Sequence, residues 1–134
     1  MKFQPITRED ERLIGAAVEI LEKRYHLSRH TVAAAVLCDS GQIYTGINVE
    51  AVGYGPCAEP IAIGTAFTNG DWSIEAIVAV SKNGVLSPCG NCRQLIFDYA
   101  PDAMVILKDG GKTVKTQARN LLPGHYSSNF GESS

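Results

Sequence analysis

The sequence lacks a long apolar run and an excess of charge of one sign. No stretch approaches the roughly 20 apolar residues that span a bilayer, and residues 1–10 turn polar without the apolar core of a signal peptide. Lys and Arg number 12 and Asp and Glu number 14, so the net charge of −2 gives no general attraction to phosphate backbones or anionic lipids. We therefore expect a cytoplasmic protein that binds neither a membrane nor a nucleic acid.

Cysteines are also few, at four in 134 residues, and their uneven spacing does not suggest a disulfide scaffold. In a reducing compartment, a close cysteine pair more often binds a metal or does chemistry than forms a structural disulfide. The composition is otherwise that of an ordinary globular protein, with 45% hydrophobic residues. The length predicts one domain over residues 1–134. The cysteines are thus the feature that needs an explanation.

Hydrophobic periodicity and turn residues predict alternating helices and strands. Thr7 and Asp10 have the spacing of a capping box, so we expect a first helix over residues 8–24. Residues 74–81 are nearly all apolar, as in a central strand buried on both faces. The remaining pattern predicts strands over 31–38, 42–48, 103–108 and 112–116, helices over 57–68 and 89–99, and a last helical turn within 117–122. This order implies a mixed sheet with helices packed on it.

Two short motifs place three cysteines at the starts of helices. Cys57 opens the helix over residues 57–68, and Cys89 and Cys92 stand three residues apart where the next helix begins. Three thiolates can converge on one zinc ion and leave a fourth position open for water, which is the arrangement of a catalytic zinc. Glu59 is better placed to reach that water than to join the ligands. Helix N-termini also favour thiolates and offset part of their charge.

Each of these features has another interpretation. Cys89-Gly90-Asn91-Cys92 alone is also typical of a thioredoxin-like redox dithiol. Cys38 is a candidate fourth ligand of a structural zinc, although a free cysteine at the end of an apolar strand usually packs as a small hydrophobe. Glu59 alone has the position of a solvated helix-terminal acid. A zinc-stabilised binding module without activity is a further class. The conjunction of C-x-E and P-C-x-x-C matches the zinc-deaminase signature, with cysteine in place of histidine, and favours the catalytic site.

Two segments resemble the cytidine deaminase family: SPCGNCRQ at residues 87–94 and TGINVE at residues 45–50. The similarity extends from about residue 28 to residue 126. It implies a three-layer α/β/α sandwich around a mixed five-stranded sheet, and a homotetramer. By the same resemblance, Cys57, Cys89 and Cys92 bind one Zn²⁺ ion, and Glu59 shuttles protons.

The resemblance also implies substrate contacts. Asn48 and Glu50 hold the ribose hydroxyls, the backbone N–H of Ala58 meets the pyrimidine O2, and the Ser87 carbonyl accepts from the departing amine. His30 stands where the family usually has an aromatic residue against the base. From the sequence alone, a lone histidine at a strand start such as His30 is more often a surface or packing residue than a base contact, and Glu50 is equally an exposed loop acid.

The chain departs from ordinary cytidine deaminases at several positions. The loop over residues 48–57 is shorter, and GPCAE at residues 55–59 resembles blasticidin S deaminase, which acts on a cytosine-containing antibiotic. Pro60 and Asn91 stand where relatives have an arginine that neutralises the thiolates. Helix dipoles, or Arg93, are left to offset that charge.

The reaction expected is hydrolytic deamination of a small 4-aminopyrimidine nucleoside, such as cytidine or deoxycytidine, to the uracil product and ammonia. In it, Glu59 takes a proton from a zinc-activated water, passes it to N3 and later protonates the leaving amine. Blasticidin S is the alternative substrate. In this family, C-terminal aromatic residues often complete a neighbour's site, and Tyr126 and Phe130 are the candidates for that role.

Overall fold

The structure is a computed structural model and describes residues 2–126 of the chain. Its helices are α1 (Arg8–Arg24), α2 (Ala58–Thr68) and α3 (Gly90–Tyr99), with a 3-10 turn η1 (Ala118–Leu121) near the end. Its strands are β1 (Gln4–Pro5), β2 (Ala33–Cys38), β3 (Ile43–Ile47), β4 (Ile74–Ser81), β5 (Gly84–Leu86), β6 (Met104–Asp109) and β7 (Lys112–Gln117). Every predicted helix and strand is present, and the predicted last helical turn is η1.

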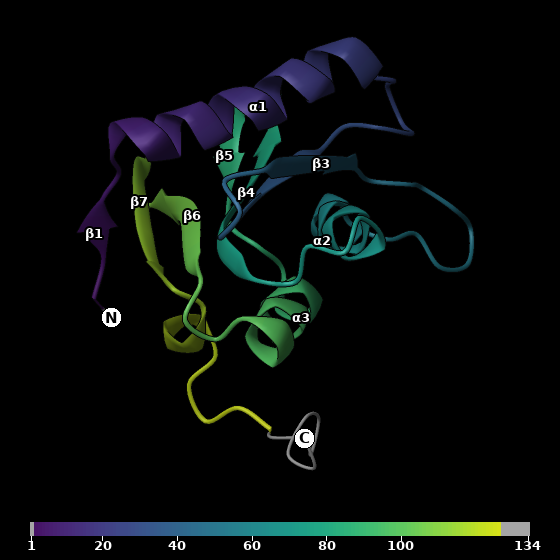
Figure 1. The fold of residues 1–134 in the computed structure, drawn as a ribbon. Coiled ribbons are helices and arrows are strands. Elements are labelled where there is room, and N and C mark those ends of the chain that lie inside the picture. The colour runs from purple at the N-terminus through teal and green to yellow at the C-terminus, as the bar shows by residue number, and fades with distance from the viewer. Residues whose placement is uncertain (1, 127–134) are drawn as a thin grey trace.

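One mixed sheet separates two helical layers (Figure 1). Helix α1 covers one face of the sheet, while α2 and α3 cover the other. The strand order is β1-β7-β6-β4-β2-β3, and β5 pairs with β4 off this path. Among the strand pairings of residues 2–126, only that of β4 with β6 is parallel. The predicted three-layer α/β/α sandwich is therefore confirmed. None of the helices within residues 2–126 has the length and apolarity needed to cross a bilayer.

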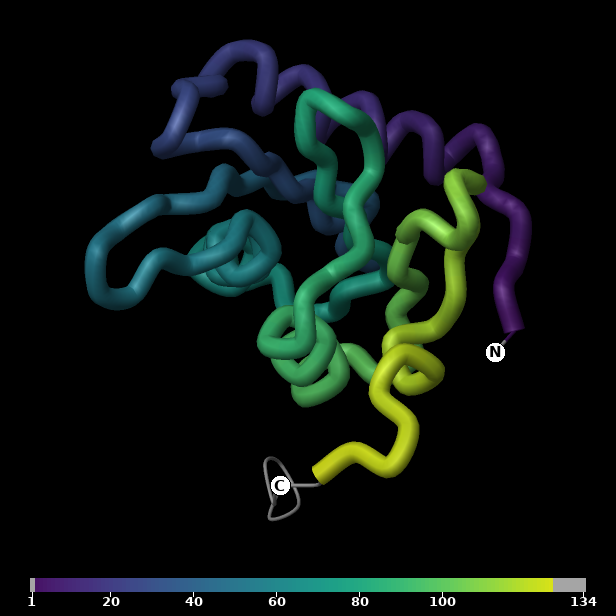
Figure 2. The backbone as a smooth tube through the Cα atoms, turned by 180° about the vertical axis from the view of Figure 1, so that it is seen from behind, coloured from purple at the N-terminus to yellow at the C-terminus, as the bar shows by residue number. Residues whose placement is uncertain are grey.

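The sheet has seven strands instead of the expected five, because two short strands extend it. Strand β1 spans two residues and β5 spans three, which is too few to show an alternating pattern. Strand β5 pairs with Ala79–Ser81 of β4, and β6 pairs with Ala76 and Ile77, so both share one edge of β4. The chain leaves β5 directly into the loop that carries Cys89, so this small strand positions one of the two cysteine motifs (Figure 2).

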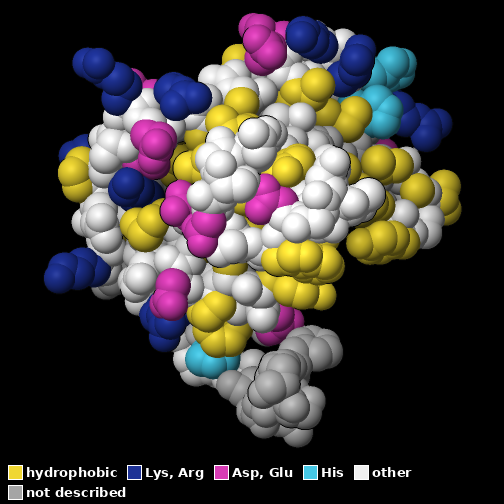
Figure 3. Space-filling model, in the orientation of Figure 1, with side chains coloured by type: hydrophobic (Ala, Val, Ile, Leu, Met, Phe, Trp, Pro, Cys, Tyr) yellow, Lys and Arg dark blue, Asp and Glu magenta, His cyan; other side chains and the backbone are white. Residues whose placement is uncertain are grey.

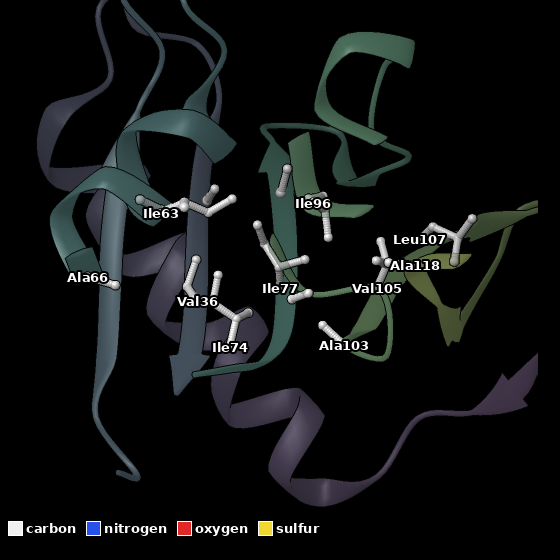
Figure 4. Close-up of a cluster of buried hydrophobic side chains, with 14 of the residues drawn as sticks. Val36, Ile63, Ala66, Ile74, Ile77, Ile96, Ala103, Val105, Leu107 and Ala118 are labelled. Carbon is white, nitrogen blue, oxygen red and sulfur yellow. The ribbon is translucent and has the colours of Figure 1, made fainter. Parts of the chain in front are cut away.

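Two hydrophobic cores form because β2 and β4 are buried on both faces. Toward α1, Leu13, Ala17 and Leu21 pack against alternate residues of the strands, such as Ala35 and Val78. The opposite core contains the buried residues of α2 and α3 and the other strand positions, among them Val36, Ile63, Ala66, Ile77, Ile96 and Val105 (Figure 4). The near-continuous apolar run of β4 is thus explained by its central place in the sandwich.

Helix α2 lies unusually close to β3, and Gly46 makes this possible. A Cβ atom at Gly46 would meet the backbone nitrogen of Ala62 at 2.5 Å and Cγ2 of Ile61 at 2.8 Å. No side chain fits there without moving the helix, whose first turn carries Cys57 and Glu59. Gly46 therefore sets how near the start of α2 lies to β3.

The start of α1 is fixed by the predicted capping box and by an ion pair. Asp10 Oδ2 accepts from the backbone nitrogen of Thr7 at 2.8 Å, and Thr7 Oγ1 accepts from the Asp10 nitrogen at 3.3 Å. Lys115 Nζ of β7 lies 2.7 Å from Asp10 Oδ2. Burial acts to raise the pKa of Asp10, but the hydrogen bonds from Lys115 and Thr7 outweigh it and lower the pKa below its ordinary value of 3.8.

Replacing Asp10 with asparagine should therefore lower the free energy of unfolding at neutral pH by about 1–3 kcal/mol. Because the folded-state pKa is lowered, the carboxylate stabilises the fold fully above its unfolded pKa, and that contribution is lost as the pH falls through the folded pKa. Urea unfolding of the wild type and the variant between about pH 7 and pH 2 measures both effects. The neighbouring exposed Glu11→Gln variant is the control. A difference of the same size at both ends of the pH range would contradict the ion pair.

Candidate active site

Three cysteine sulfurs converge where α2 and α3 begin. Cys57 and Cys89 are the N-cap residues of the two helices, and Cys92 is buried in the first turn of α3. The Sγ atoms of Cys57 and Cys89 are 3.9 Å apart, and all three sulfurs lie within 4.8 Å of one another. Three thiolates at about 2.3 Å from a tetrahedral zinc would be about 3.8 Å apart, so this donor set fits one zinc ion and leaves its fourth position open.

The local backbone explains why these side chains are free to bind a metal. Both N-cap residues are extended, and neither sulfur caps its own helix by a side-chain hydrogen bond. An N-cap residue is normally serine, threonine, aspartate or asparagine, whose oxygen accepts from the first turn. With cysteine there, the sulfurs remain available while the helix N-termini point toward them.

The pKa values of the three thiols are shifted in different directions by their surroundings. Burial acts to raise the pKa of Cys89, but hydrogen bonds from the backbone and thiol of Cys92, the Cys57 thiol and the Asn91 backbone outweigh it, so this pKa is lowered. Burial raises the pKa of Cys57 and of Cys92, and for Cys92 the nearby charge of Glu59 adds to the effect. The start of α3 thus favours the Cys89 thiolate, as expected for a helix N-terminus.

Arg93 does not reach the sulfurs as a direct counter-charge. Its Nε donates to the Pro88 carbonyl at 2.9 Å and its Nη1 to the Leu121 carbonyl at 3.4 Å. These bonds hold the loop before Cys89 against η1. Among the residues described, the backbone N–H groups at the two helix starts are what remains to offset the thiolate charge.

Cys38 is separate from this cluster. Its side chain is fully buried in the core beneath α2, and the three converging sulfurs are those of the other cysteines. Burial and the nearby Asp71 raise the pKa of the Cys38 thiol to about 11. The prediction that Cys38 packs in the core is confirmed.

Glu59 lies beside the cluster in the first turn of α2. It is only 6% exposed, and burial raises the pKa of its carboxyl, while its backbone amide and the Cys92 thiol act in the other direction as hydrogen-bond donors. A carboxyl with a raised pKa exchanges protons more readily near neutral pH. This arrangement suits a residue that carries protons next to a metal site. The alternative interpretation of Glu59 as a solvent-exposed acid at a helix end is wrong, because the side chain is buried.

A cavity of about 230 Å³ opens beside Cys57 and Cys89. Seven of the nine residues predicted for the site line it: Asn48, Glu50, Cys57, Ala58, Glu59, Ser87 and Cys89. Cys92 belongs to the sulfur cluster without lining the cavity, and His30 does not line it. A larger cavity of about 720 Å³ is bordered by Trp72, Glu75 and Asp102 at the other end of β4, but it contains no cysteine. We therefore place the candidate site in the smaller cavity, which is lined by Cys57, Glu59 and Cys89.

Other lining residues were not predicted, among them Thr31, Val32, Gly55 and Leu86. Gly55 had a sequence signal, since Gly-Pro marks a turn. A Cβ atom there would lie 2.9 Å from the Val49 carbonyl oxygen, so the loop closes tightly only with glycine. Tyr126 is exposed and is not among the lining residues, whereas Phe130 lies outside the described residues.

Comparisons with known proteins decide the family. A sequence model of the cytidine and deoxycytidylate deaminase zinc-binding region matches residues 7–108. The chain belongs to this family. A blasticidin-S deaminase of Bacillus cereus is 39% identical over 140 aligned positions, which cover 96% of this chain and 100% of that protein. A cytidine deaminase of Sporosarcina psychrophila is 35% identical, with 87% and 90% of the two chains covered.

Solved structures agree with the sequence comparison. The crystal structure of cytidine deaminase from Burkholderia pseudomallei superposes with a TM-score of 0.75 at 33% identity, covering 90% of this chain and 100% of that one. The cytidine deaminase of Mycobacterium tuberculosis gives a TM-score of 0.76 at 28% identity, covering 91% and 100%. Membership of this family makes the protein a zinc-dependent hydrolytic deaminase. The redox-dithiol and inactive-module interpretations are thereby excluded.

Proposed function

We propose that the protein deaminates a free cytidine-type nucleoside, cytidine or deoxycytidine, to the corresponding uracil nucleoside and ammonia. The observation that carries this proposal is a single cavity lined by two cysteines of the metal cluster, by Glu59 and by the Asn48–Glu50 pair. The cysteines and Glu59 suit the reacting base, and the polar Asn48–Glu50 pair suits a sugar. Together they fit a base joined to a ribose.

Cys57, Cys89 and Cys92 hold the zinc ion. When bound, zinc supplies a water acidic enough to act as a nucleophile at neutral pH. Glu59 accepts the proton of that water and delivers it to N3 of the base, which makes C4 more electrophilic. The water oxygen bonds to C4, and Glu59 takes its second proton and delivers it to the 4-amino group, so that the C4–N bond breaks and ammonia leaves. One buried carboxyl thus serves first as base and then as acid.

Four further residues orient the substrate. Asn48 Nδ2 lies 3.2 Å from Glu50 Oε1, and the two side chains together present a donor and acceptors to the ribose hydroxyls. The Ala58 backbone N–H, at the start of α2, faces the pyrimidine O2. The Ser87 carbonyl accepts from the leaving amine, while its side-chain Oγ donates to the Lys108 carbonyl at 3.2 Å.

The charge of the cavity favours a nucleoside over a nucleotide. Glu50 and Glu59 line it, and no lysine, arginine or histidine of the described residues does so. A 5′-phosphate would bring about two negative charges close to carboxylates without a basic partner. We therefore expect kcat/KM for cytidine 5′-monophosphate to be at least about tenfold lower than for cytidine.

Blasticidin S is the second candidate substrate. A specific observation favours it, since the Bacillus cereus blasticidin-S deaminase is 39% identical over its whole length. The GPCAE segment at residues 55–59 points the same way. The homotetrameric assembly and the cytoplasmic location stay predictions.

Ammonia release from a panel of substrates tests these proposals. We expect turnover of cytidine and deoxycytidine, weak turnover of the monophosphate, and a measurable rate with blasticidin S only if the second candidate is correct. The Glu50→Gln variant should reduce the difference in kcat/KM between cytidine and its monophosphate, because it removes one charge that repels the phosphate. Equal rates with nucleoside and nucleotide would contradict the charge argument. Activity on free cytosine alone would contradict the ribose role of Asn48 and Glu50.

A further inference from the structure

His30 lies behind the cavity wall and is tied to a residue that lines the cavity. Its ring Nδ1 is 2.9 Å from the backbone carbonyl oxygen of Asn48. A carbonyl oxygen only accepts hydrogen bonds, so Nδ1 carries a hydrogen and donates it. The ring nitrogen thus faces the backbone just after β3, and His30 is absent from the cavity lining.

Hydrogen bonds to its side-chain oxygen hold Asn48 in one orientation. Its Oδ1 accepts from the backbone nitrogens of Thr31 at 2.9 Å and Val32 at 3.0 Å. Only the oxygen of the amide can accept these bonds, so Nδ2 must point the other way, where Glu50 Oε1 lies at 3.2 Å. Asn48 is only 5% exposed. Residues 30–32 therefore determine where both substrate-facing side chains lie.

The backbone nitrogen of Asn48 also donates to the Val32 carbonyl at 3.0 Å, and the chain that follows it leads into a loop. The loop between β3 and α2 projects from the molecule, with Val52 and Tyr54 among its exposed apolar side chains (Figure 3). The backbone nitrogen of Val49 donates to the Pro56 carbonyl at 3.0 Å and closes the base of the loop. Within residues 2–126, His30 is the one side chain that donates to the backbone of residues 48–50.

We propose that His30 is a positioning residue that holds Asn48 and Glu50 in place for the ribose, and that it makes no contact with the base. This inference rests on the proposed nucleoside deamination. It differs from the position's expected role, because an aromatic residue against the base would need its ring in the cavity. It also explains a histidine at this place, since phenylalanine or tyrosine has no ring N–H to donate to Asn48.

Steady-state kinetics of His30→Phe, His30→Ala and His30→Asn on cytidine test the proposal. We expect the first two variants to raise KM about threefold to tenfold with kcat within about twofold of the wild type, as for the loss of one partly buried hydrogen bond. His30→Asn should recover most of the affinity, because its Nδ2 has nearly the reach of Nδ1. With 2′,3′-dideoxycytidine, which lacks the 2′ and 3′ hydroxyls of the sugar, all three variants should match the wild type. His26→Phe is the control, since its Nδ1 lies 3.0 Å from the Leu27 carbonyl oxygen at the exposed surface.

Each alternative outcome overturns the inference. A His30→Phe variant that matches or exceeds the wild type would indicate a base contact. A His30→Asn variant as weak as His30→Ala would exclude the hydrogen bond as the cause. Equal KM increases with cytidine and the dideoxynucleoside would exclude action through the ribose. Unchanged zinc content and melting temperature distinguish a loss of positioning from misfolding. A wild type that releases no ammonia from either nucleoside would refute the proposed function itself, and this inference with it.

Discussion

Replacement of Glu59 with glutamine is expected to lower kcat by about 10²–10⁴-fold while leaving one zinc per chain. Glutamine has the shape of glutamate but cannot accept a proton from water and return it to the substrate. The buried position beside the sulfur cluster tolerates an uncharged group, since burial raises the pKa of the Glu59 carboxyl and so favours its neutral form. The fold should therefore survive the change. Ammonia release and elemental analysis of the same preparation measure the two quantities.

The control for this variant is Glu19→Gln, which changes an exposed helical carboxylate next to Lys23. It should match the wild type in both rate and zinc content. If Glu59→Gln deaminated cytidine at the wild-type rate, Glu59 would have no role in proton transfer. If the variant lost its zinc instead, the residue would act on the metal site and not on the substrate.

Replacement of any one of Cys57, Cys89 and Cys92 with serine is expected to remove most of the zinc and all measurable turnover. Three ligands already leave one position open, so the loss of a further thiolate leaves only two protein ligands. Removing the metal from the wild type with a chelator should reproduce the loss of turnover, and adding zinc should restore it.

Cys38→Ala is the matched control for these three variants. It should keep one zinc per chain and full activity, and lower the free energy of unfolding by about 1–2 kcal/mol because it leaves a small void in the core. Zinc loss in this variant, as severe as in the other three, would return Cys38 to the ligand set. Retained zinc in Cys57→Ser would instead exclude Cys57 from it.

The metal cluster was predictable because its information is local. Cys57 and Glu59 are two residues apart, Cys89 and Cys92 are three apart, and each pair stands at the start of a helix whose apolar pattern is visible in the sequence. Helical geometry then fixes the side-chain directions. The central strand β4 was predictable for a similar reason, since a short, nearly continuous run of apolar residues is typical of a strand that is buried on both faces.

The contacts that span the chain could not be predicted in this way. Strand β5 has three residues and is defined as a strand only by its pairing with β4. Arg93 was considered as a counter-charge for the thiolates, yet its Nη1 bonds the Leu121 carbonyl, 28 residues later. No periodicity records such a pairing, because it depends on how the helices pack on the sheet.

By itself, the sequence determined the mixed sheet with helices packed on it, the two cysteine motifs at helix starts, the carboxylate near Cys57 and the separate place of Cys38, since these follow from spacing within single elements and from their apolar neighbours. The tertiary structure alone decided that His30 bonds the Asn48 backbone behind the cavity and that Asn48 turns its amide toward Glu50. These two facts depend on hydrogen bonds between the residues before β2 and those after β3. Their partners are set by strand pairing, which brings together positions 16 to 18 residues apart.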